Sequence, residues 1–107
     1  MKVIAEGDLK ELLTTGRNKK YREIERNVLL MNGLKRVVHI MMAVESSDEL
    51  NSFSFLHYEK LKYGFRGWSS VRLSNSYVHR LLFEELDDPI GLKLIEIDKT
   101  HYGNKKG

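Results

Sequence analysis

The sequence has 107 residues, 41% of them hydrophobic and 31% charged, a balance that predicts one globular domain over residues 1–107 and excludes a disordered chain. It contains no cysteine, which excludes a disulfide framework, a thiolate nucleophile and a cysteine-based zinc site. No apolar run has the length of a signal peptide or a membrane span, so we expect a cytoplasmic protein, and the formal net charge of +3 gives a mild bias toward polyanionic partners.

The N-terminal half predicts a short strand followed by helices. Residues 1–5 are apolar enough for the strand, Asp8 is a candidate N-cap, and Gly16 is a typical left-handed end for the short helix that follows. Over residues 21–44 apolar residues recur every three or four positions, which predicts one long amphipathic helix. Gly33 inside it costs about 1 kcal/mol relative to alanine, which points to close packing there.

The C-terminal half changes from a helical period to a period of two. Residues 68–73 alternate, 74–76 form a polar turn, and 77–83 alternate again, which predicts a hairpin. Residues 87–91 are a strong turn signal, and 92–97 supply the next strand. The expected fold class is α+β, with a short N-terminal strand and two helices packed on one face of a mainly antiparallel twisted sheet.

Basic residues gather in the part of the chain that forms the hairpin. Between residues 56 and 83 a single acid, Glu59, faces five bases: Lys60, Lys62, Arg66, Arg72 and Arg80. Aromatic residues such as Trp68 and Tyr77 stand among them, a mixture that suits RNA, whose phosphates pair with cations and whose bases stack on rings. The alternative is that these bases are solvated edge charges over an ordinary core.

Strand alternation assigns some of these side chains to a face of the sheet. If Val71 and Leu73 face the helices, Arg72 faces away, onto the open side. The phase of the following strand is ambiguous, so either Arg80 or His79 points to that side.

The remaining residue types favour phosphate chemistry without a metal or cofactor. The four histidines are widely separated and none forms a ligand-spaced pair, so we expect no metal site. The chain lacks a phosphate-binding glycine loop and a nucleophile elbow. Arginine, lysine, tyrosine and histidine remain as candidate functional groups.

Three segments in the C-terminal half carry a family resemblance. Residues 56–62 with 67–73 resemble the "LKG…GxWSIR" segment of RelE/HigB-like toxins, residues 80–83 are similar to their "YRLIF" strand, and residues 95–103 are similar to their terminal strand and "DHYG" close. The N-terminal half is similar only in its order of strand and helices.

The resemblance implies the RelE-like fold and the function of a toxin in a bacterial toxin–antitoxin pair. It implies a metal-independent, ribosome-dependent endoribonuclease that cleaves mRNA and arrests translation. It also implies a cognate antitoxin as partner, with a helix-turn-helix DNA-binding domain in the HigB branch.

The same resemblance implies roles for individual residues. Arg72 and Arg80 would bind the phosphate, His101 and Tyr102 would transfer protons or stack on a base, and Lys62 would stabilise charge or contact the backbone. His57 and His79 are reserve candidates for proton transfer. The expected RNA-binding residues are Lys60, Arg66, Trp68, Tyr77 and His79.

Two other functions remain open from the sequence. The related ParE-like toxins share the fold and inhibit DNA gyrase by binding it, and a non-catalytic RNA-binding module would bind RNA without cutting it. His101 and Tyr102 argue against the gyrase alternative, because such a toxin has no use for an RNA-cutting pair.

Overall fold

The computed structural model describes residues 1–61, 67–87 and 90–99. Its sheet has five strands: β1 (Lys2–Ile4), β2 (Glu59–Lys60), β3 (Trp68–Arg72), β4 (Arg80–Asp87) and β5 (Ile90–Asp98). Their order in space is β1-β5-β4-β3-β2. The β1–β5 pair is parallel and the other pairs are antiparallel. The expected α+β class with a mainly antiparallel sheet is confirmed, whereas the two-residue strand β2 was not foreseen.

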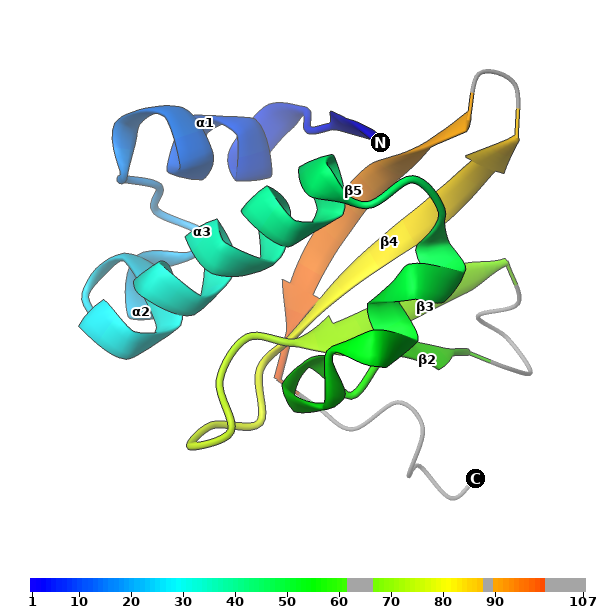
Figure 1. Ribbon diagram of the computed structural model, residues 1–107. Coiled ribbons are helices and arrows are strands. Elements are labelled where there is room, and N and C mark those ends of the chain that lie inside the picture. Colours follow the sequence, from blue (N-terminus) through cyan, green and yellow to red (C-terminus); the bar gives the residue numbers. More distant parts are fainter. Residues whose placement is uncertain (62–66, 88–89, 100–107) are drawn as a thin grey trace.

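Helices cover one face of this sheet. The α-helices are α1 (Gly7–Thr15), α2 (Arg22–Glu25) and α3 (Val28–Ala43), followed by two 3₁₀ helices, η1 (Ser47–Ser52) and η2 (Ser54–Leu56). Figure 1 shows α3 crossing the sheet, with α1 and α2 beside it. Alternate strand residues meet α3 in the hydrophobic core, whose members include Leu30, Leu34, Val37, Met41, Val71, Leu81, Phe83, Leu92 and Leu94. None of the described helices has the length and apolar character needed to cross a bilayer.

The segment expected to form one long helix is divided in two. The break lies at Asn27, whose backbone is extended with φ −113° and ψ 108°. Its side-chain oxygen accepts a hydrogen bond from the backbone N–H of Leu30 at 3.1 Å. An asparagine that caps a new helix competes with continuation of the old one, so the apolar period of 21–44 persists while the helix does not.

Two smaller expectations also change. Asp8 is not the N-cap of α1, because Glu6 holds that position and Asp8 lies in the first turn. Its carboxylate instead accepts a hydrogen bond from the side-chain amide of Asn18 at 2.9 Å. Strand β4 begins at Arg80 and not at residue 77, since Leu73 N–H bonds to the His79 carbonyl oxygen at 3.2 Å and closes the turn there. Gly16 does end α1 in the left-handed conformation, with φ 79°.

Gly33 brings α3 against the end of β3. A Cβ added at this glycine would overlap the Leu73 carbonyl oxygen and stand 2.9 Å from the carbonyl carbon. Both atoms belong to the backbone, which cannot move aside as a flexible side chain can. The close packing suggested by the sequence is therefore present, and it fixes the helix to the strand that carries Arg72.

We predict that Gly33→Ala destabilises the protein although alanine is the better helix former. Overpacking against rigid backbone lowers the free energy of unfolding by about 1–3 kcal/mol, whereas the gain in helix propensity is about 1 kcal/mol. Urea unfolding followed by circular dichroism measures the difference. The control is Asn32→Ala, at the exposed neighbouring position, which should be neutral or slightly stabilising. An increase in stability for Gly33→Ala would contradict the close approach.

Candidate functional site

The candidate site lies on the sheet face opposite the helices. Val71 and Leu73 are fully buried in the core, so Arg72 between them faces the other side, as the alternation predicted. The ambiguity in the next strand is also resolved. Arg80 pairs in register with Arg72, and it therefore shares the open face.

Two arginines thus stand directly opposite each other on neighbouring antiparallel strands. The Arg80 guanidinium is held by hydrogen bonds from Nη1 to Ser70 Oγ at 3.2 Å and to Glu59 Oε1 at 3.5 Å. Its side chain is 14% exposed, against 46% for Glu59. Arg80 is thus held by a serine of β3 and by a carboxylate of β2.

Charges of both signs surround Arg80: Glu59 contacts it, Asp98 pairs with it in register on β5, and Arg72 lies opposite it on β3. Burial lowers the pKa of the Arg80 guanidinium below its ordinary value, Glu59 opposes that shift, and Arg72 adds to it. Among the described residues, three buried side-chain nitrogens have no hydrogen-bond partner: the Nε of Arg72 on this face and both ring nitrogens of His79 on the helix side. A buried donor with no acceptor beside a second cation is an arrangement that an oxyanion such as phosphate would complete.

Trp68 extends this face along β3. It lies two residues from Ser70 on the same side of the strand and is partly buried. An indole at this position can stack on a base while the arginines hold a phosphate. Of the expected RNA-binding residues, Trp68 is the one that shares a face with the arginine pair in the described part of the chain.

Lys60 lies on the opposite face, with Glu85. Its Nζ is 3.8 Å from Glu85 Oε1. The Glu85 carboxylate also accepts hydrogen bonds from three hydroxyls, those of Ser47, Tyr58 and Ser69. Burial raises the pKa of Glu85, but these donors outweigh it and leave the pKa below its ordinary value, while burial and Glu85 raise the pKa of Tyr58 to about 12. This network joins η1 to the sheet and leaves Lys60 away from the arginine pair.

Tyr77 and His79 also lie on the helix side. His79 is buried, its ring packs edge-on against Tyr77, and its Nε2 is 3.4 Å from Glu23 Oε2. Tyr77 is partly buried against the core. The reserve candidate His57 is exposed at the end of η2, in the left-handed conformation with φ 49°. These three residues are not brought to the arginine pair.

Four of the expected site residues, Lys62, Arg66, His101 and Tyr102, lie outside the described residues. Within residues 1–61, 67–87 and 90–99, no group of three or more histidine, aspartate or glutamate side chains is placed to hold a metal ion.

Glu59 is the functional candidate that the sequence reasoning missed. Glu59 is the one acid among the five bases of residues 56–83, and the strand that carries it is two residues long. The available signal was its isolation, because a lone carboxylate among bases and aromatics can serve as a proton acceptor. In the structure it pairs with Ser70 in register and contacts Arg80.

Comparison with known proteins gives a fold and no sequence family. The sequence matches no protein-family model and no curated protein. Two solved structures share the fold. A YoeB/ParE toxin from Agrobacterium tumefaciens has a TM-score of 0.58 at 12% identity, over 94% of this chain and 100% of that one. A YoeB from Staphylococcus aureus, solved as a dimer, has a TM-score of 0.53 at 18% identity, over 95% of this chain and 98% of that one. The chain therefore has the RelE-like fold of these toxins.

We predict that Arg72→Gln leaves the protein as stable or slightly more stable, whereas Glu59→Gln destabilises it. Like charges directly opposite each other across two strands cost about 0.2–1 kcal/mol, and the first change removes that repulsion. The second removes the carboxylate that offsets it, at a cost of about 0–1 kcal/mol for so exposed a partner. Parallel urea unfolding curves compare the two variants with Lys10→Gln as control. Equal destabilisation by both changes would mean that the arginines do not repel each other.

Proposed function

We propose that this chain is the toxin of a bacterial toxin–antitoxin pair and that it cleaves mRNA on the ribosome without a metal ion. The observation that carries the proposal is the arginine pair on the open face, with a buried, unpartnered Nε on Arg72 and a carboxylate beside Arg80. The fold shared with a YoeB/ParE toxin and a YoeB supports the toxin part of the proposal.

The residues of the open face suit the first half of RNA cleavage. Attack by the ribose 2′-oxygen on the adjacent phosphorus needs a group that takes the 2′-hydroxyl proton, and we assign that role to the Glu59 carboxylate. As the new P–O bond forms, negative charge grows on the phosphate oxygens. Arg72 and Arg80 are assigned to stabilise that charge, which other nucleases offset with a divalent ion.

The second half of the reaction needs a proton donor. The bond from phosphorus to the 5′-oxygen breaks as that oxygen gains a proton. His101 and Tyr102 are proposed for this step, or for stacking on a base beside it. Lys62 is proposed to stabilise charge or contact the RNA backbone. Lys60, Tyr77 and His79, which lie on the helix side, are assigned to structure in this proposal, and Trp68 to base stacking.

A cognate antitoxin, the ribosome and mRNA are the proposed partners. The gyrase alternative predicts a different readout, because it requires inhibited supercoiling and intact messenger. Incubation with translating ribosomes followed by mapping of messenger 5′ ends separates the two, and a supercoiling assay with purified gyrase runs beside it. Binding of RNA without new 5′ ends would support the non-catalytic module.

Arg72→Ala and Arg80→Ala should each lower messenger cleavage by about 10²-fold or more, because each removes a charge that meets the transition state. The fold should remain, since neither side chain belongs to the core. The rate of appearance of new 5′ ends measures the effect, with Lys35→Ala, at an exposed lysine of α3, as matched control. Wild-type rates in both folded variants would contradict the assignment.

The proposal makes a separate prediction for the C-terminal tail. Deletion of residues 103–107 should be tolerated, whereas His101→Ala combined with Tyr102→Ala should abolish cleavage and retain antitoxin binding. Thermal melting accompanies the assay, because a loss caused by unfolding would mean that the two residues serve packing. Full cleavage by a folded double variant would remove the tail from the mechanism.

A further inference from the structure

A second concentration of positive charge lies far along the sequence from the arginine pair. Residues 17–26, which we call the basic segment, include α2 and connect α1 to α3. The segment contains five lysines and arginines and two glutamates, a net charge of +3. The whole chain has the same formal net charge, so its other residues sum to zero. Residues 56–83, with five bases and one acid, carry a net charge of +4, so the positive charge of the chain is concentrated in these two stretches.

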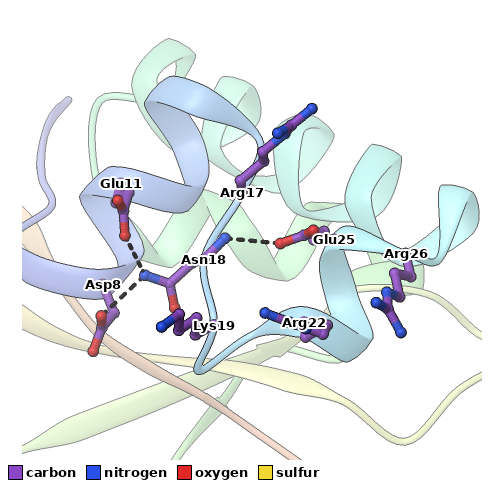
Figure 2. Close-up of a pocket in the computed structure, with 8 residues that line it drawn as sticks. All are labelled: Asp8, Glu11, Arg17, Asn18, Lys19, Arg22, Glu25 and Arg26. Carbon is purple, nitrogen blue, oxygen red and sulfur yellow. Dashed lines mark hydrogen bonds between the residues drawn. The ribbon is translucent and has the colours of Figure 1, made fainter.

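The acids around the basic segment are all occupied by partners inside the fold. The Asn18 side-chain amide donates to Asp8 Oδ1 at 2.9 Å and to Glu11 Oε1 at 2.7 Å. The Asn18 backbone N–H donates to Glu25 Oε1 at 2.8 Å. Glu23 accepts from Lys99 Nζ at 3.2 Å. Figure 2 shows Asn18 at the centre of its three carboxylates.

The bases of the segment face solvent. Arg17, Lys19, Arg22 and Arg26 are exposed and line a hollow of about 500 Å³ (Figure 2). Within the part of the chain that the structure describes, none of these four has a carboxylate within 4.0 Å. Asp8, Glu11 and Glu25 line the same hollow and stay charged, because their donor Asn18 is neutral, so the eight lining residues sum to a net charge of +1. The positive charge that reaches a partner is that of the four exposed bases.

The basic segment lies at the end of the sheet that carries the arginine pair. Glu23 on α2 contacts both His79 and Lys99. His79 directly precedes Arg80, and Lys99 directly follows Asp98, which pairs with Arg80 in register. The segment itself is on the helix side and the arginine pair on the open face, so a polyanion bound at both has to pass around this end of the sheet.

We propose that the basic segment binds the phosphate backbone of RNA outside the position of cleavage. The identity of the polyanion rests on the proposed function. An acidic protein is the other partner to test, since specific protein contacts need apolar anchors and the exposed Val28 and Leu29 lie just beyond the segment. Within the segment the apolar side chains, Tyr21 and Ile24, are buried at 6% and 2% exposure. The exposed side chains of residues 17–26 themselves are all charged, which suits sequence-independent contact with phosphates.

The test measures RNA affinity of the full chain as a function of salt. The probe is a labelled oligouridylate of about 16 nucleotides, the upper range for one small binding domain. Fluorescence anisotropy compares the wild type with a triple variant, Arg17→Gln, Arg22→Gln and Arg26→Gln. The matched control removes the same charge elsewhere, at the exposed residues Lys2, Lys10 and Lys35, each changed to Gln. Circular dichroism melts verify that both triple variants fold.

The triple variant should bind the probe at least about tenfold more weakly at low salt, with the slope of log K against log salt reduced by about 2, since each lost single-strand phosphate contact accounts for about 0.7. The control triple should change that slope by less than about 0.7. Equal losses in the two triples would overturn the proposal. The proposal would also be overturned if oligoglutamate of matched charge bound the wild type as tightly as the RNA probe does.

A ribosome cleavage assay on the same proteins keeps this inference distinct from the proposed function. If the wild type binds RNA through the segment and cuts no messenger, the nuclease function fails and the inference stands. If the wild type cuts messenger and the triple variant binds RNA like the control triple, the inference fails and the nuclease function stands.

Discussion

Helix α3 approaches the end of β3 so closely that only a glycine fits between them, and the placement of the functional face follows from this contact. The approach sets Gly33 against the carbonyl of Leu73 and holds the helical layer on one side of the strand. Because strand residues alternate, the same strand end must direct Arg72 to the other side. The register with β4 then brings Arg80 opposite Arg72. Packing on one face thereby determines the spacing of two cations on the other.

The arginine pair is built at some expense to stability. Two guanidinium groups share one cross-strand position, and burial disfavours the charged form of Arg80. Ser70 and Glu59 offset part of this cost. Sites that act on a substrate commonly keep such residual strain, because the substrate supplies the missing interaction. At the opposite end, Glu85 has hydroxyl donors on both oxygens, which is the pattern of a structural carboxylate.

Periodicity in the sequence was enough to predict which face of a strand a side chain occupies. Features that depend on single contacts, such as the helix break and the short strand β2, were not predicted. Alternation around Val71 and Leu73 was enough to assign Arg72 to the open face. It could not assign His79, because that residue stands one position before β4 begins and no strand period applies to it. The division of the long helix at Asn27 left the apolar spacing intact, so the spacing gave no sign of it. Lys60 and Glu59 belong to a two-residue strand, too short for any period, and their opposite faces follow from pairing with Ser69 and Ser70.

Asn18 affects the charge of the surface around it as well as the local structure. A neutral amide donates to two carboxylates and its backbone to a third, so one uncharged residue holds three negative charges in place. Aspartate is nearly the same size but has no protons to donate when ionised. Deamidation at this position would add a fourth negative charge and remove the amide donor that Asp8 and Glu11 share. The charge of the surface around α1 and α2 therefore depends on whether the Asn18 side chain remains an amide.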